Sequence, residues 1–279
     1  MVLSCLIDMT YLNHELTPSL LTINDLVAMK QVGEKISCLT AYDASFSALI
    51  DAAGIDVMLV GDSLGMVMQG HDTTLPVTIN DMIYHSRCVT QARKRAFLIA
   101  DLPFMTYTTP IVAAENAAQL MQVGGAQMVK LEGPHFEVVR FLVNLGVPVC
   151  AHLGLLPQSI NQLGRYKVQG KAPGESAKIK SDALKLQEAG ASLLVLECIP
   201  TELAQEITAE LSIPVIGIGA GVECDGQVLV LYDMLDIGVC KRPRFSKNFM
   251  KGADSIFDAV FAYHQAVKAQ QFPSIEHTF

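Results

Sequence analysis

Short apolar runs that end on a polar residue recur along the chain. The first, residues 57–63, reads Val-Met-Leu-Val-Gly-Asp-Ser and has the length of a buried parallel strand. It ends on an acid and a hydroxyl, which are costly to bury without partners. Later runs end in the same way, on Asp101, Glu132, His152 and Glu197. Five such ends in series predict one site to which several strands contribute.

Segments of helical spacing alternate with these runs, and glycine follows many of them. Strands are predicted at 36–43, 57–63, 97–102, 128–132, 148–153, 193–198, 214–221 and 228–235. Helices are predicted at 45–53, 79–92, 110–123, 135–145, up to Gly190, 201–211 and within 248–269, after a short helix capped by Thr22 or Asn24. Long loops at 64–77 and 154–174 are candidates for covering the site.

Eight strands that alternate with helices predict an α/β fold, a (β/α)8 TIM barrel. A doubly wound open sheet is the competing fold, because alternation alone does not close a barrel. Polar strand ends occur throughout the chain, whereas an open sheet gathers them near one switch point, which favours the barrel. We expect one catalytic domain at 22–279. Residues 1–21, which have no clear period, form a short N-terminal extension.

Composition narrows the class of protein. The chain of 279 residues is 51% hydrophobic and 17% charged, as in a compact globular protein. Its net charge of −8 argues against a nucleic-acid surface, which needs clustered Lys and Arg. The basic groups 93–95 and 241–244 are expected to cap helices or lie in loops.

Seven cysteines without a CxxC pair indicate a reducing compartment, the cytoplasm, and neither a disulfide framework nor a zinc site. Residues 1–21 lack the basic start of a signal peptide. No apolar run approaches the roughly 20 residues that span a bilayer. We therefore expect no membrane association.

Lys130 and Glu132 lie two residues apart in a predicted strand, so both point to the same side. If the apolar residues between and before them face the helices, this pair faces the barrel axis. An ion pair with a purely structural role is one interpretation. His152 alone would likewise be read as a satisfied core residue, but its place at a strand end raises the chance of substrate contact.

Taken together, the strand ends favour a metal site. They place four carboxylates in one barrel mouth against one Lys and one His, and such a cluster must take up protons or bind a cation. Oxygen ligands favour Mg²⁺ or Mn²⁺ over zinc. The four carboxylates belong to Asp62, Asp101, Glu132 and Glu197.

Other candidates are weaker. Residues 217–221, Gly-Ile-Gly-Ala-Gly, lack the last glycine of a dinucleotide-binding fingerprint. Lys130 as a Schiff-base nucleophile would need a low pKa, which neighbouring carboxylates oppose. Cys198 alternates to the opposite face from Glu197 and is expected to pack in the core.

Several long motifs resemble one enzyme family, in order, from about Thr22 to Phe279. They are residues 59–66, 69–78, 100–105, 129–133, 151–155, 157–159, 166–170, 194–198 and 216–221, with 272–273 and 276–277 near the end. The chain resembles the 3-methyl-2-oxobutanoate hydroxymethyltransferase (ketopantoate hydroxymethyltransferase) family. Residues 1–21 extend beyond the family pattern, and 238–244 match it loosely.

The resemblance implies an Mg²⁺-dependent (β/α)8 barrel that catalyses the first step of pantothenate synthesis. The reaction transfers a hydroxymethyl group from 5,10-methylenetetrahydrofolate to 3-methyl-2-oxobutanoate and gives 2-dehydropantoate. The resemblance also implies a cytoplasmic homo-oligomer, which is a decamer in well-known members.

The resemblance further implies roles for individual residues. Glu197 would be the base that removes a substrate proton. The metal would be held by Asp62 and Asp101, with Glu132 close by, directly or through water. The substrate contacts would be Asp62, Ser63, Asp101, Lys130 and His152.

Two other functions stay open at this point. The first is a phosphoenolpyruvate mutase or isocitrate lyase relative, an Mg²⁺-dependent enzyme acting on a 2-oxo acid, although the cysteine nucleophile loop expected of a lyase is absent. The second is a non-catalytic metabolite-binding barrel, which would keep the pocket but exchange no substrate proton.

Overall fold

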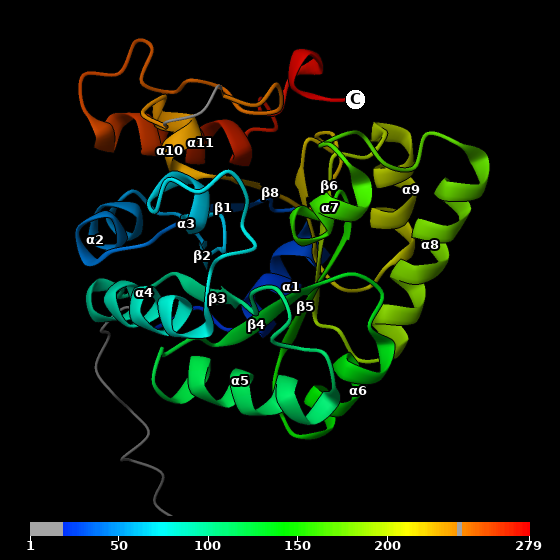
Figure 1. The fold of residues 1–279 in the computed structure, drawn as a ribbon. Coiled ribbons are helices and arrows are strands. Elements are labelled where there is room, and N and C mark those ends of the chain that lie inside the picture. The colour runs from blue at the N-terminus through cyan, green and yellow to red at the C-terminus, as the bar shows by residue number, and fades with distance from the viewer. Residues whose placement is uncertain (1–18, 239–241) are drawn as a thin grey trace, which may run out of the picture.

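Eight parallel strands close into a barrel in a computed structural model that describes residues 19–238 and 242–279. Each strand pairs with the next along the chain, and the first pairs with the last, as Figure 1 shows. The strands are β1 Ile36–Thr40, β2 Val57–Val60, β3 Phe97–Asp101, β4 Met128–Glu132, β5 Val149–Gly154, β6 Leu193–Glu197, β7 Val215–Ile218 and β8 Gly226–Leu229. The predicted barrel is confirmed, and the open sheet is wrong.

Helices surround the barrel (Figure 1). They are α1 Ile23–Val32, α2 Ala44–Ala52, α3 Leu64–Val67, α4 Ile79–Ala92, α5 Pro110–Gln122, α6 Phe136–Asn144, α7 Ile160–Leu163, α8 Pro173–Glu188, α9 Thr201–Glu210, α10 Leu231–Leu235 and α11 Ile256–Lys268, with the 3-10 turns η2 Pro157–Ser159 and η3 Ile275–His277. The hydroxyl of Thr22 caps α1, one of the two predicted caps. Most of the extension predicted at 1–21 lies outside the described residues, which begin at 19.

Two apolar cores follow from the alternation of side chains along each strand. One lies between the strands and the outer helices, and the other fills the barrel interior. Leu26 of α1 belongs to the inner core and is fully buried. Lys30 Nζ, also on α1, lies 2.6 Å from Asp225 Oδ2, just before β8. Helix α1 therefore closes the end of the barrel at which the strands begin.

The eighth predicted strand, 228–235, is wrong in extent. β8 covers Gly226–Leu229 and is followed by the short helix α10. The backbone N of Leu231 donates to Thr40 Oγ1 at 2.9 Å instead of continuing the ladder. A Cβ on Gly226 would collide with the carbonyl O of Ile36, so the close approach of β8 to β1 requires glycine there.

Helix α11 lies within the predicted stretch 248–269 and begins only at Ile256, because Ser255 caps it and residues 249–254 form bends and a turn. Its last residue, Lys268, reaches back to the barrel, with Nζ 2.8 Å from Oδ2 of Asp56, a fully buried carboxylate. Arg95 Nη2 lies 2.9 Å from the other oxygen of Asp56. This ion-pair network attaches the C-terminal helix to the barrel.

The cysteines and the helices agree with two expectations from the sequence, the lack of a disulfide framework and the lack of a membrane-spanning run. The five cysteines that the structure describes are unpaired, and most are buried. Within residues 19–238 and 242–279, no helix is long and apolar enough to cross a membrane.

Candidate active site

A cavity of about 450 Å³ opens at the carboxyl ends of the strands. The rest of its lining is largely apolar, with Val195, Ile218, Val228 and Phe245 among its members. All seven residues predicted for the site line it: Asp62, Ser63, Asp101, Lys130, Glu132, His152 and Glu197. The structure therefore brings together side chains that are up to 135 positions apart in sequence, counting from Asp62 to Glu197.

Strand register sets the positions of these side chains. Asp101 pairs with Lys130 across β3 and β4, and Glu132 pairs with His152 across β4 and β5. Leu131 lies in the core beneath the helices, so its neighbours Lys130 and Glu132 point into the barrel. The predicted orientation of this pair is confirmed.

Asp101 joins two strand ends through its two carboxylate oxygens. Lys130 Nζ lies 2.6 Å from Asp101 Oδ1, and the backbone N of Asp62 donates to Oδ2 at 3.0 Å. Burial lowers the pKa of Lys130, but the carboxylates of Asp101, Glu132 and Asp62 outweigh it and raise the pKa. Lys130 therefore stays a cation and is unsuited to attack a carbonyl as a free amine.

Asp62 is a buried carboxylate with carboxylate neighbours. Only 4% of the residue is exposed, and burial together with Asp101 and Glu132 raises its pKa well above the ordinary range. Carboxylates this close repel each other when both are ionised, so either a proton or a bound cation stabilises the group. The negative charge of these carboxylates therefore favours a positively charged ligand.

Gln158 is a functional residue that we did not predict. Its Nε2 donates to Asp62 Oδ2 at 2.8 Å, and its backbone N donates to Glu132 Oε2 at 3.0 Å. Tyr107 donates its hydroxyl hydrogen to Gln158 Oε1. The residue belongs to the 3-10 turn η2, in the long loop after β5, and its only signal in the sequence was the motif at 157–159.

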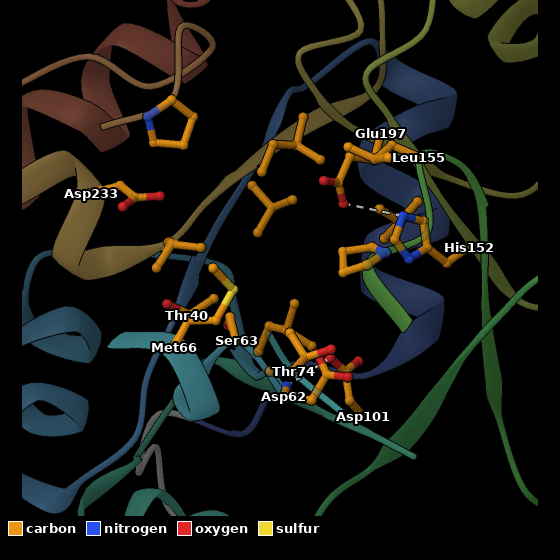
Figure 2. Close-up of a pocket in the computed structure, with 18 of the residues that line it drawn as sticks. Thr40, Asp62, Ser63, Met66, Thr74, Asp101, His152, Leu155, Glu197 and Asp233 are labelled. Atoms are coloured by element: carbon orange, nitrogen blue, oxygen red, sulfur yellow. Dashed lines mark hydrogen bonds and ion pairs between the residues drawn. The ribbon is translucent and has the colours of Figure 1, made fainter. Parts of the chain in front are cut away.

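His152 lies between two carboxylates on the other side of the cavity. Its Nε2 is 3.3 Å from Glu197 Oε2, and its Nδ1 is 3.7 Å from Glu132 Oε1. Burial lowers the pKa of His152, but these two carboxylates outweigh it and raise the pKa to about 9. Figure 2 shows Glu197 and His152 facing Asp62 and Asp101 across the cavity.

Ser63 follows β2 and shares a hydrogen bond with a tyrosine. Its Oγ lies 2.8 Å from the hydroxyl of Tyr42, a fully buried side chain that the sequence did not identify. Tyr42 thereby orients the serine hydroxyl at the cavity wall.

The donor set suits a hard cation. Within the described residues, no three His, Cys, Asp or Glu side chains form a ready-made set of metal ligands. Mg²⁺ differs from zinc in this respect, because it usually takes one or two carboxylates and completes its shell with water and substrate oxygens. Asp62 and Asp101, whose oxygens line the cavity, fit that requirement.

Similarity to known proteins identifies the family. The family model described as ketopantoate hydroxymethyltransferase matches residues 20–275. A 3-methyl-2-oxobutanoate hydroxymethyltransferase of Burkholderia thailandensis is 57% identical over 97% of this chain and all of its own length. The enzyme of the same name from Burkholderia mallei shows the same identity and coverage.

Solved structures of other enzymes share the fold. Phosphonopyruvate hydrolase in complex with oxalate and Mg²⁺ matches with a TM-score of 0.58 and 11% identity, over 92% of this chain and 93% of its own. Phosphoenolpyruvate phosphomutase from Streptomyces platensis matches with a TM-score of 0.57 and 10% identity, over 90% and 98%. Identity this low shows a common barrel alone and gives no support to a mutase or lyase activity. On the family match and the 57% identical relatives, the chain belongs to the ketopantoate hydroxymethyltransferase family.

Proposed function

We propose that this protein transfers a hydroxymethyl group from 5,10-methylenetetrahydrofolate to 3-methyl-2-oxobutanoate, giving 2-dehydropantoate. The observation that carries the proposal is the division of the cavity. Asp62, Asp101 and Lys130 gather on one side, and Glu197 with His152 faces them from the other. A 2-oxo acid between them has its charged end and its reacting carbon on opposite sides.

Asp62 and Asp101 are the residues that would hold Mg²⁺, with Glu132 near them. When bound, Mg²⁺ would supply Lewis-acid polarisation of the 2-oxo group, which contributes several kcal/mol to enolate stability in such sites. Support comes from the crowding of these buried carboxylates and from the fold neighbour that is described with Mg²⁺.

Lys130 and Ser63 bind the 2-oxo acid in this proposal. The ammonium of Lys130 is a permanent cation and pairs with the substrate carboxylate, while the Ser63 hydroxyl donates to a substrate oxygen. Contacts with both C1 and C2 of the substrate fix the orientation of C3. Holding the reacting carbon in place in this way lowers the entropic part of the barrier.

Glu197 acts as the base. Its side chain is 14% exposed and lies at the end of β6, held by its contact with His152. The C3–H bond breaks, its proton passes to the Glu197 carboxylate, and its electron pair forms the enolate. A water molecule adds its oxygen to the methylene carbon of the folate as the first of that carbon's two bonds to nitrogen breaks. The enolate carbon then forms a bond with the same carbon as the second bond to nitrogen breaks, and the released nitrogen takes up the proton held by Glu197. His152 Nε2 lies 3.3 Å from Glu197 Oε2, and this contact holds the carboxylate at the cavity wall.

Deuterium exchange at C3 of 3-methyl-2-oxobutanoate, measured by NMR without folate, tests the proposal. We expect Mg²⁺-dependent exchange in the wild type and a loss of at least about 100-fold in Glu197→Gln, the usual size of a general-base contribution. The matched control is Glu202→Gln, at an exposed position on α9. Full exchange in Glu197→Gln would remove this residue as the base.

We further propose a cytoplasmic homo-oligomer, a decamer. The support in the fold is an apolar surface on α11, where Phe257 and Phe261 are 40% and 45% exposed and their rings stack at 6.3 Å. Clustered exposed apolar side chains are typical of protein–protein contact surfaces. Sedimentation velocity should show a decamer in the wild type and smaller species in Phe261→Ser. A wild-type monomer would contradict the proposal.

A further inference from the structure

A second cavity, of about 470 Å³, lies beside the mouth of the first. Pro243 lines both cavities. Phe245 lines the first, while its sequence neighbours Arg244 and Ser246 line the second. The segment that carries these residues is therefore the wall between the cavities, and a long ligand seated in the first meets the second just beyond Pro243.

The second cavity is cationic. Its charged lining consists of four cations and one carboxylate: Arg242, Arg244, Lys247, Lys251 and Glu276. Because the whole chain carries a net charge of −8, this excess of positive charge is local. Burial lowers the pKa of His277 at the same site, and three of these cations lower it further, as expected where positive charges converge.

These cations are only partly neutralised within the chain. Arg242 Nε lies 3.4 Å from Asp236 Oδ1, and Arg244 Nε donates to the carbonyl O of Glu276 at 3.1 Å. Lys247 and Lys251 form no ion pair with any acidic side chain that the structure describes. Both ammonium groups therefore lack an acidic partner, although Lys247 Nζ lies 4.9 Å from the centre of the Phe249 ring.

Ser246 gives an independent indication of a ligand. It lines the cavity and is only 4% exposed, yet its Oγ has no hydrogen-bond partner in residues 19–238 and 242–279. A buried hydroxyl without a partner is costly, and such groups commonly mark a site for a ligand or an ordered water. An entering carboxylate oxygen would accept its hydrogen bond.

We propose that this basic cavity binds the glutamyl carboxylates of the folate co-substrate while the one-carbon unit reacts in the first cavity. The inference rests on the proposed function, which supplies a ligand with an uncharged reacting end and a chain of carboxylates. The glutamyl carboxylates are bound by Lys247, Lys251 and Ser246. Arg244 extends the positive surface toward Pro243. A tail with more glutamyl residues makes more charge-assisted contacts.

The test compares 5,10-methylenetetrahydrofolate carrying one or three glutamyl residues. The wild type should have a lower KM for the triglutamate. In a Lys247→Gln, Lys251→Gln double variant that KM should rise roughly three- to tenfold, as expected for two partly exposed ion pairs. Ser246→Ala should raise the same KM. Lys94→Gln, an exposed lysine just before β3 at the opposite end of the barrel, is the charge-matched control.

The folate-independent exchange at C3 separates the possible outcomes. It should be unchanged in every variant, because none of these residues touches the 2-oxo acid, and this also shows that the variants are folded. An unchanged KM for the triglutamate in the double variant overturns the tail site. Absence of exchange in the wild type would instead contradict the proposed function.

A different observation points to the other end of the same ligand. Asp233, on α10, lines the first cavity and points into it across from His152 in Figure 2. In the described part of the chain, its carboxylate forms no hydrogen bond or ion pair. Burial raises its pKa to about 6, although the positive charge of Arg242 acts in the opposite direction. A carboxylate in such a position needs donors from a ligand.

We infer that Asp233 accepts the paired N–H donors of the pterin ring, the ring N–H and the adjacent amino group, in a two-point hydrogen bond. This second inference also rests on the proposed function. Asp233→Asn keeps the shape of the side chain but places an amide N–H, a hydrogen-bond donor, against one of the pterin N–H donors. The KM for the folate should therefore rise about tenfold or more. KM for the 2-oxo acid and the C3 exchange should not change.

Asp254→Asn, at an exposed position, is the matched control. An unchanged folate KM in Asp233→Asn overturns the assignment. A slower C3 exchange together with a rise in the KM values for both substrates would also overturn it, because these changes would indicate a structural role.

Discussion

Asp62 follows β2 and Glu132 ends β4, and Gln158 is the residue that links them. One amide side chain and one backbone N–H satisfy two buried carboxylates at once. Because removing one partner of a buried polar group costs more than the bond itself contributes, the effect of losing Gln158 should exceed that of an ordinary surface amide.

Gln158→Ala should lower the free energy of unfolding by about 1–3 kcal/mol, because Asp62 and Tyr107 lose their partner. It should also weaken Mg²⁺ binding, since Asp62 would no longer be oriented. Urea denaturation and Mg²⁺ titration of the exchange reaction measure the two effects. Gln162→Ala, at an exposed position on α7, is the control and should change neither. Equal behaviour of the two variants would contradict this role.

Asp233 predicts a pH dependence of stability. Its pKa is raised by burial from 3.8 to about 6, so the folded protein binds this proton more tightly than the unfolded chain. As pH rises from about 4 through 6, the wild type should therefore lose stability relative to Asp233→Asn, by about 1–2 kcal/mol after solvent screening. Denaturation of both proteins at pH 4, 5, 6 and 7 measures the difference. A constant difference would contradict the shift.

Most of the site residues found from sequence share one property, although Asp62 and Ser63 follow β2. Lys130, Glu132 and Glu197 lie in strands, where alternation alone decides which side chains face the barrel axis. Gln158 contacts two of the site carboxylates from a loop turn, and Asp233 lines the cavity from a short helix. Their positions depend on how those segments fold over the barrel, and local sequence spacing does not determine that.

At the scale of elements, the strand ends depend on close backbone contacts. Gly154, the last residue of β5, has φ +96°, and a Cβ there would collide with the carbonyl O of Glu197. That carbonyl accepts a hydrogen bond from the backbone N of Leu155 at 2.8 Å. The glycine therefore determines how closely β5 approaches the strand end that carries the base.

Gly154→Ala should destabilise the protein and also slow C3 exchange, because β6 must shift to make room. Gly146→Ala provides the matched control, since Gly146 also has positive φ, +81°, but nothing within 4 Å of its Cβ position. The control should cost about 1 kcal/mol from backbone strain alone and leave the exchange rate unchanged. Thermal unfolding and NMR exchange measure both. Equal exchange rates in the two variants would show that β6 does not depend on this contact.

Element boundaries were predicted well where local signals agree and poorly where tertiary contacts decide. β4 and α4 match the prediction to the residue. The 228–235 run is apolar except for Asp233, and its composition does not distinguish a strand from a buried helix. The bond from Leu231 N to Thr40 Oγ1, between residues 191 positions apart, marks the change from strand to helix.

For the whole molecule, the C-terminal helix is attached to the barrel by the charges around Asp56. Burial raises the pKa of Asp56, but Lys268 and Arg95 outweigh it and lower the pKa. The stabilisation is therefore present above the ordinary Asp pKa and is lost as pH falls through the lowered value.

Lys268→Met should lower the free energy of unfolding at pH 7 by about 1–3 kcal/mol, because it removes one of the two cations paired with the buried carboxylate of Asp56. Lys178→Met is the control. The Lys178 side chain pairs with Asp182 but is 72% exposed, so this substitution should lower the free energy of unfolding by less than about 1 kcal/mol. Guanidinium denaturation at pH 7 compares them. If the two variants lost the same stability, the network would not hold α11 in place.

Helix α1 seals the barrel at the end where its strands begin, with Leu26 inserted into the inner core. With that end closed by the described residues, ligands reach the site through the opening at the carboxyl ends of the strands. The residues proposed to hold the 2-oxo acid lie at the strand ends, while the basic cavity proposed for the folate tail lies outside that opening. We therefore expect a compulsory kinetic sequence, in which the small acid binds first, the folate closes over it, and the spent folate departs before the product.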